Sequence, residues 1–156
     1  MHRIEDIKEL KRKAIDIRRD ILTMLEKAGS GHTGGSLSMV EILMVLYYRR
    51  MRIDPRKHKW RQRDKFILSK GHGCPALYAV LADLGFFPKE ELWTLRKLGS
   101  RLQGHPQLGL PGLEISSGSL GQGLSIAVGM AIADRIDGID AQVYCLMGDG
   151  ETNEGQ

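Results

Sequence analysis

Cysteine is scarce in this sequence, and its two copies lie far apart. Cys74 and Cys145 form no C-x-x-C pair, which argues against a zinc site and against a disulfide framework. We interpret both residues as free thiols. Cys145 lies in an apolar run and is expected to be a small core residue.

The N-terminus lacks an uninterrupted apolar stretch. Residues 1–13, MHRIEDIKELKRK, alternate charged and single apolar residues, which argues against a signal peptide or a membrane span there. Internal repeats and low-complexity segments are also absent. With 156 residues, of which 42% are hydrophobic and 27% charged, the chain has room for a single core. We expect a cytoplasmic protein with no membrane partner, consisting of one domain or part of one.

Aromatic residues are few where positive charge is most concentrated. Residues 49–65, RRMRIDPRKHKWRQRDK, carry much of the excess behind the net charge of +4. A nucleic-acid-binding arm would interleave aromatic residues for base stacking, but this segment holds only Trp60 and is interrupted by Asp54 and Pro55. We predict a solvated connection and no nucleic-acid partner, although basic charge also suits the surroundings of a site for phosphorylated ligands.

Apolar residues at steps of three and four predict a first helix that ends at Gly29. This stripe consists of Ile4, Ile7, Leu10, Ala14, Ile17, Ile21 and Leu25. The S-x-x-E pattern of Ser38 and Glu41 is typical of a capping box. It predicts a second helix over about 39–50.

Short apolar segments alternate with the remaining predicted helices. Strands are predicted over 66–69 and 142–147. A proline suits the first turn of a helix over 75–84, and residues 89–98 have a weaker amphipathic pattern. A helix over 124–136 contains small residues that favour tight packing, namely Ala127, Gly129, Ala131 and Ala133.

This order of elements predicts an α/β fold, a parallel sheet with helices on both faces. Ligands of such sheets gather at the carboxyl ends of the strands. Two strands alone would make a small sheet with an exposed edge. We therefore expect residues 1–156 to form the N-terminal portion of a larger domain, apparently truncated.

Two glycine-rich loops are candidate binding elements. They cover Gly29–Ser36, GSGHTGGS, and Ser116–Gly123, SSGSLGQG. Glycine at such density suits a backbone that must approach a ligand closely and argues against regular structure. Both loops are expected at the rim of the sheet where ligands bind.

Three of the five histidines follow a glycine: His32, His72 and His105 do, whereas His2 and His58 do not. Imidazole suits proton transfer near neutral pH and hydrogen bonds to phosphate or sugar oxygens. Zinc is the alternative use, but it favours closely spaced ligands supported by cysteine. The wide spacing therefore favours a ligand site.

A single carboxylate follows the second predicted strand, in Gly148-Asp149-Gly150. Such a group at a strand end, flanked by glycines whose N–H groups can meet phosphate, suits a magnesium–diphosphate site. A plain Asp-Gly turn is the alternative. Glu154 adds a second carboxylate, which could also be a surface residue near a helix start.

Together these segments resemble the N-terminal part of transketolase. They occur in family order across nearly the whole chain, which makes the series far more specific than any one member. The matching segments are SGHTGGSLS (30–38), RDKFILSKGHGCPALYAVL (63–81), QGHP (103–106), SSGSLGQGLSIAVGMA (116–131) and LMGDGETNEGQ (146–156).

The resemblance implies a thiamine-diphosphate-binding fold and a divalent metal, Mg²⁺ or alternatively Ca²⁺ or Mn²⁺. Asp149 resembles the metal ligand of the family. Gly150 resembles the backbone donor to the cofactor's diphosphate, and Glu154 a member of a carboxylate network between subunits.

The resemblance also implies roles for the other loops. His72 resembles the histidine near the diphosphate and the thiazole ring. Gly118 and Leu120 resemble residues that contact the cofactor through backbone and packing. His32 and His105 resemble the catalytic histidines that face the hydroxyls of the donor sugar.

The implied reaction is transfer of a two-carbon glycolaldehyde unit from a ketose phosphate to an aldose phosphate. The implied partners are sugar phosphates and either a second copy, in a homodimer, or a C-terminal subunit, in a heterotetramer. Further metal ligands and the pyrimidine-binding domain are expected downstream of Gln156, so we expect the 156-residue chain alone to be inactive.

Two positions depart from the family pattern, because Thr33 and Ser119 stand where many members have proline. Both changes affect loop stiffness rather than chemistry. Two alternatives remain open: another thiamine-diphosphate enzyme, such as a deoxyxylulose-phosphate synthase or a phosphoketolase, and a non-catalytic binding fragment.

Overall fold

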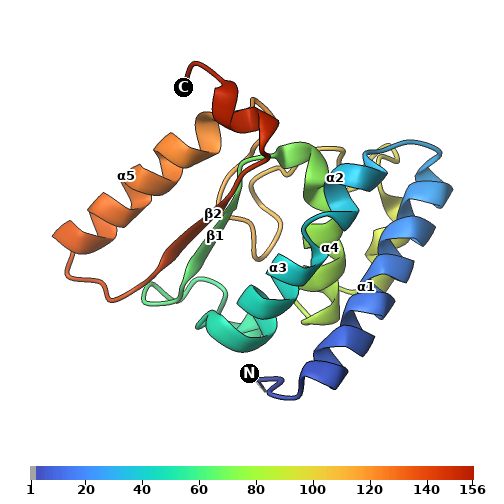
Figure 1. Ribbon diagram of the computed structural model, residues 1–156, viewed down its shortest axis with the longest axis horizontal. Helices are drawn as coiled ribbons and strands as arrows, with labels where there is room; N and C mark the ends of the chain where they lie inside the picture. Colours follow the sequence, from blue (N-terminus) through green and yellow to red (C-terminus); the bar gives the residue numbers. More distant parts are fainter. Residues whose placement is uncertain (1–2) are drawn as a thin grey trace.

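A two-stranded parallel sheet lies between helices in the computed structural model, which describes residues 3–156 (Figure 1). Strand β1 (Lys65–Leu68) pairs with β2 (Val143–Leu146) so that Phe66 lies opposite Tyr144. Helix α5 lies on one side of the strands and the other helices on the opposite side. The predicted parallel α/β fold with helices on both faces is confirmed. The helices are α1 (Ile7–Ala28), α2 (Thr33–Leu37), α3 (Val40–Val45), α4 (Cys74–Asp83) and α5 (Gln122–Ile136).

Helix α1 forms where its stripe of apolar residues was predicted. The Asp6 side chain accepts a hydrogen bond from the N–H of Lys8 and caps the start, and Gly29, with φ of 63°, ends the helix in the left-handed region. Ile17 and Ile21 are fully buried against the core that α1 shares with α3 and α4. Ile7, the first residue of the helix and a member of the stripe, is 60% exposed. His2 lies outside the described residues.

The predicted capping box at Ser38 is wrong, although α3 begins close to the predicted position. Ser38 has helical backbone angles and ends α2, whereas a capping residue needs a non-helical backbone. Its hydroxyl donates to the carbonyl of Gly35, and Glu41 pairs with Arg18 instead of reaching back. A π-helical turn, Leu46–Arg50, extends α3 to the predicted end.

The first glycine-rich loop also contains more regular structure than predicted. Residues 33–37 form α2. The hydroxyl of buried Ser36 donates to the carbonyl of His32 at 2.8 Å, a bond that ties the helical turn together. Glycine density alone was therefore a poor guide to this segment.

Helix α4 follows β1 through a 3₁₀ turn, Gly71–Gly73. Pro75 lies in its first turn, as predicted, and every residue from Cys74 to Ala82 is buried. A helix that is apolar on all sides needs such complete burial. The predicted helix 89–98 is shorter: a 3₁₀ helix covers Lys89–Thr94, and Arg96, with φ of 61°, prevents its continuation.

The outer surface of α5 is exposed among the described residues. Of the small residues predicted to pack tightly, Ala127 is buried, but Gly129, Ala131 and Ala133 are exposed, so that prediction is wrong for three of the four positions. Gly123 supplies the close contact instead, because a Cβ there would lie 2.5 Å from the Ser69 side chain. Within residues 3–156 no helix is both long and apolar enough to cross a membrane.

The basic segment 49–65 leads into the amino end of β1, away from the glycine-rich loops, which lie at the other end of the strand (Figure 1). Its charge therefore does not surround the candidate ligand loops. The residues Arg56, Lys57, Lys59, Trp60, Arg61 and Gln62 are exposed, which confirms the predicted solvated connection.

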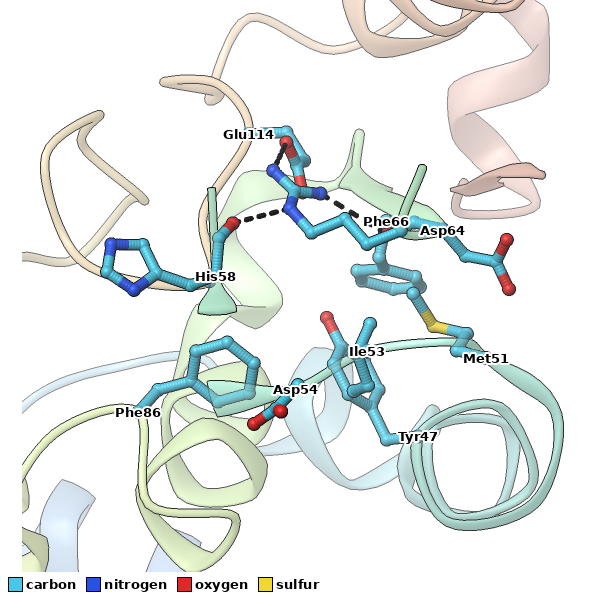
Figure 2. Close-up of a pocket in the computed structure, with 11 residues that line it drawn as sticks. Tyr47, Met51, Ile53, Asp54, His58, Asp64, Phe66, Phe86 and Glu114 are labelled. Atoms are coloured by element: carbon cyan, nitrogen blue, oxygen red, sulfur yellow. Dashed lines mark hydrogen bonds and ion pairs between the residues drawn. The ribbon is translucent and has the colours of Figure 1, made fainter. Parts of the chain in front are cut away.

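Other cations of this segment pair with carboxylates. Arg63 makes two bonds to Glu114, at 2.5 and 2.8 Å, and a third to the carbonyl of His58. Figure 2 shows Glu114 and His58 in the upper part of this pocket, with Tyr47 and Phe86 below them. The cavity beside them measures about 10 Å³, room for at most one water molecule. This pocket is therefore a packed contact between segments and has no room for a ligand.

Candidate functional site

The two strands end side by side, and the predicted loops lie together at this carboxyl end of the sheet. The N–H of Ser69, which follows β1, donates to the carbonyl of Leu146, the last residue of β2, at 2.9 Å. The turn 71–73, α2, the start of α5 and the turn 150–153 all lie at this end of the sheet (Figure 1). Ligands of parallel sheets bind at such carboxyl ends.

The three histidines that follow a glycine come together there. The rings of His32 and His72 have centroids 5.0 Å apart. A Cβ at Gly35 would lie 2.9 Å from the ring of His72, and one at Gly118 would lie 3.0 Å from the ring of His105. His32 and His105 are exposed and His72 is partly buried. These glycines thus make room for the imidazoles.

The turn 71–73 and the second glycine-rich loop approach each other through their backbones. A Cβ at Gly71 would lie 2.8 Å from the backbone carbonyl of Ser117, so that position has no room for a side chain. The hydroxyl oxygen of Ser117 is buried and has no hydrogen-bond partner among residues 3–156. Buried hydroxyls normally have a partner, so Ser117 is an unsatisfied polar group at this contact.

Asp149 presents a free carboxylate at the end of β2. Its side chain is exposed and accepts no hydrogen bond from the described residues, while its backbone carbonyl accepts two bonds from Thr152. A Cβ at Gly150 would meet open space. The described residues contain no cluster of three or more His, Cys, Asp or Glu side chains arranged around a metal ion, so Asp149 stands alone as a candidate metal ligand.

The other predicted residues lie nearby. Leu120 is partly buried in the loop before α5. Glu154 is exposed, and a Cβ at Gly121 would lie 3.0 Å from the Cβ of Glu154. The structure therefore brings all eight predicted site residues to one end of the sheet.

Glu151 was missed by the sequence reasoning. Its side chain is buried and accepts three hydrogen bonds: Oε1 from the Ser69 hydroxyl at 2.5 Å and from the N–H of Gly121 at 2.8 Å, and Oε2 from the N–H of Gly148 at 2.8 Å. Burial by itself raises the pKa of Glu151, but these bonds together lower it. The available signal was its place directly after Gly148-Asp149-Gly150.

Lys70 was also missed. It is 7% exposed, and its Nζ donates to the carbonyl of Gly35 and to the hydroxyl of Ser38, both at 3.0 Å. Burial lowers the pKa of Lys70, and the carboxylates of Glu151 and Asp149 oppose that shift. Lys70 therefore joins α2 to the end of β1 and adds positive potential next to both carboxylates.

The pKa of His72 is lowered as well. Burial is the main cause, followed by repulsion from His32, Lys70 and His105, and the Glu151 carboxylate opposes the shift. His72 is thus held neutral near pH 7. A neutral imidazole can donate one hydrogen bond and accept another.

Comparison with known proteins shows the family to which this chain belongs. The family described as "Transketolase, thiamine diphosphate binding domain" matches residues 10–156. The chain belongs to this family. The resemblance read from the loop motifs is therefore confirmed, and so is the fold that it implied.

The curated relatives of this transketolase-family chain include proteins named as transketolase subunits. It is 48% identical over 149 residues to the 6-deoxy-6-sulfo-D-fructose transketolase subunit of Clostridium sp., covering 95% of this chain and 54% of that subunit. It is 46% identical over 138 residues to an apulose-4-phosphate transketolase subunit of Phocaeicola vulgatus, covering 88% of this chain and 49% of that subunit. The chain thus spans about half the length of these relatives.

Relatives named simply as transketolase are similar over a smaller share of their length. The mouse enzyme is 43% identical over 155 residues, covering 97% of this chain and 24% of that enzyme. The crystal structure of transketolase from Campylobacter jejuni superposes with a TM-score of 0.88 at 37% identity, covering 96% of this chain and 25% of that one. Fold and family therefore agree.

Proposed function

We propose that this chain is the thiamine-diphosphate-binding part of a two-subunit transketolase. The observation that carries the proposal is the meeting of three histidines, close backbone and the free carboxylate of Asp149 at one end of a parallel sheet. Its 48% and 46% identity to two proteins named as transketolase subunits, against 43% to mouse transketolase, of which it covers only 24%, favours the two-subunit form. In that form the partner subunit supplies the pyrimidine-binding side.

The residues present fit a diphosphate and a hard divalent cation. An unpaired carboxylate is the ligand type that Mg²⁺ prefers, with Ca²⁺ and Mn²⁺ as alternatives. In the proposal Asp149 ligates this metal, and the N–H of Gly150 bonds the diphosphate. Glu154 belongs to a carboxylate network at the subunit contact. Because one carboxylate is a weak clamp for Mg²⁺, the 156 residues alone are expected to be inactive.

The remaining residues orient the sugar and the cofactor. Bound thiamine diphosphate supplies the nucleophile for the ketose carbonyl and the sink for the electrons of the broken bond. His32 and His105, both exposed, bond the hydroxyls of the donor sugar and exchange protons with them. His72 lies near the diphosphate and the thiazole ring as a neutral partner, while Gly118 and Leu120 contact the cofactor through backbone and packing.

The test is two-carbon transfer by the native enzyme, purified with its partner subunit. With Mg²⁺ and thiamine diphosphate, xylulose 5-phosphate and ribose 5-phosphate should react, and omission of the cofactor should abolish the reaction. Because the relatives named above use other sugars, 6-deoxy-6-sulfo-D-fructose serves as a second donor. Transfer from either donor supports the proposal.

Two results would contradict it. Pyruvate decarboxylation or acetyl-phosphate formation without two-carbon transfer would indicate a deoxyxylulose-phosphate synthase or a phosphoketolase. Salt-dependent nucleic-acid binding with no response to thiamine diphosphate would instead indicate a non-catalytic binding fragment.

A further inference from the structure

Glu151 connects three segments of the site through one side chain. Its Oε1 joins the end of β1, at Ser69, to the start of α5, at Gly121, and its Oε2 joins both to the end of β2, at Gly148. We propose that Glu151 is a positioning residue that locks the loop 118–121 onto the turn 148–150, so that the two segments hold thiamine diphosphate in one fixed arrangement. This inference rests on the proposed function.

The bond to Gly148 fixes the metal-binding turn. The Glu151 side chain accepts a hydrogen bond from the N–H of Gly148, three residues earlier. This bond closes a ring of the chain that contains Asp149 and Gly150. Thr152 completes the turn through two bonds to the carbonyl of Asp149, at 3.2 Å from its N–H and 2.6 Å from its hydroxyl. The backbone of Asp149 is thereby fixed and its exposed carboxylate remains free to bind a cation.

The bond to Gly121 fixes the opposite loop. Gly121 precedes the first residue of α5 and has φ of 85°, a conformation that favours glycine. A carboxylate beside a helix N-terminus is stabilised by the helix dipole. Gly121 directly follows Leu120, and Gly118 lies against the ring of His105. The position of the Glu151 carboxylate therefore sets where this loop lies relative to Asp149.

The substitution Glu151→Gln tests the lock with little change in volume. An amide has one acceptor oxygen, and its NH₂ group cannot accept a hydrogen bond. One of the two N–H groups, from Gly121 or Gly148, is then left facing a donor, which forces its loop to move. Asn153→Ala is the matched control, because Asn153 is exposed in the same turn.

The experiment uses the native enzyme together with its partner subunit. It measures thiamine diphosphate affinity at saturating Mg²⁺, and kcat at saturating cofactor. We expect Glu151→Gln to weaken cofactor binding about 10–100-fold, the range typical of groups that orient metal ligands. The value of kcat at saturation should change by less than about threefold, because the reacting groups are intact once the cofactor is bound. Asn153→Ala should behave as the wild type.

A second measurement follows the hydrogen bonds that the Glu151 carboxylate accepts from Gly121 and Gly148. Amide hydrogen exchange at Gly121 and Gly148 should accelerate in Glu151→Gln and stay unchanged in Asn153→Ala, because exchange reports the opening of individual hydrogen bonds. A purely structural role would lower the melting temperature without changing cofactor affinity, and that pattern would overturn the inference.

Failure of the two proposals can be told apart. If the wild-type enzyme binds no thiamine diphosphate, the proposed function fails; if it binds and Glu151→Gln binds equally well, only the positioning role fails. Should Glu151→Gln not fold, Ser69→Ala removes one donor and leaves both backbone bonds in place. A several-fold loss of cofactor affinity is then expected, and unchanged affinity would overturn the inference.

Discussion

The imidazole of His72 lies against that of His32, with ring centroids 5.0 Å apart. Burial is the largest cause of the lowered pKa of His72, and the Coulombic effect of the neighbouring His32 is the next. We therefore expect His32→Asn to raise the pKa of His72 toward its ordinary value. Imidazole proton shifts in an NMR titration would measure it. An unchanged His72 pKa in this variant would contradict the assigned coupling between the two rings.

The same shift predicts how stability depends on pH. In the unfolded chain His72 titrates near 6.5, and in the folded chain its pKa is lower. The unfolded state therefore binds more protons as the pH falls below about 6.5, which favours unfolding there. The contribution of His72 to stability is complete above that pH and is lost on acidification. His72→Asn should reduce the slope of stability between pH 6.5 and 5, measured by urea unfolding.

Among residues 3–156, Arg63 and Glu114 form the most enclosed ion pair that carries two parallel bonds. Their side chains are 18% and 10% exposed, so removal of one partner leaves a charge largely excluded from water. We expect Arg63→Met to cost about 2–4 kcal/mol of unfolding free energy, somewhat below the range for fully buried pairs. Urea unfolding of the variant measures this cost.

The pair Arg101–Glu91 provides the control, because it is also bidentate and is 48% and 29% exposed. Arg101→Met should cost about 0–1 kcal/mol. Equal costs for the two arginine variants would show that the Arg63 pair acts as a solvated surface bridge. The double variant Arg63→Met with Glu114→Gln should cost less than the sum of the single variants.

Gly71 and Gly129 make a matched pair of glycine positions. A Cβ at Gly71 would lie 2.8 Å from the backbone of Ser117, whereas one at Gly129, inside α5, would meet nothing within 4 Å. We expect Gly71→Ala to destabilise the protein by about 1–3 kcal/mol, as overpacking does, and Gly129→Ala to stabilise it by about 0.5–1 kcal/mol through helix propensity. Thermal unfolding distinguishes the two signs, and stabilisation by Gly71→Ala would contradict the close approach of these loops.

Much of the fold follows from patterns in single segments. The stripe along α1, the proline in the first turn of α4 and the two apolar strands were predictable, because each depends on neighbours along the chain. The failures have a different origin. Ser38 could not cap α3 because α2 already runs into it, and the left-handed Arg96 shortened a helix whose amphipathic pattern alone looked continuous. Cys145, expected in the core, is only partly buried.

The site was predictable in its exposed groups and unpredictable in the groups that join its segments. Glycine and histidine mark the loops by their spacing, and the motif order named the family. Glu151 and Lys70 act instead through partners 82 and 35 residues away, Ser69 and Gly35. Contacts of this kind depend on the tertiary fold, so no local sequence pattern predicts them.

Asp149 carries the proposed metal site alone among the described residues, which makes its removal decisive. Asp149→Ala should abolish Mg²⁺-dependent binding of thiamine diphosphate by the native enzyme, because the hard cation loses its charged ligand. Titration of the cofactor at several Mg²⁺ concentrations measures this effect. Glu26→Gln removes an exposed carboxylate on α1 and should leave the titration unchanged. Since the Asp149 carboxylate accepts no hydrogen bond from the described residues, its loss should also leave the melting temperature nearly unchanged without Mg²⁺. Magnesium-dependent affinity that survived in Asp149→Ala would rule out the metal role.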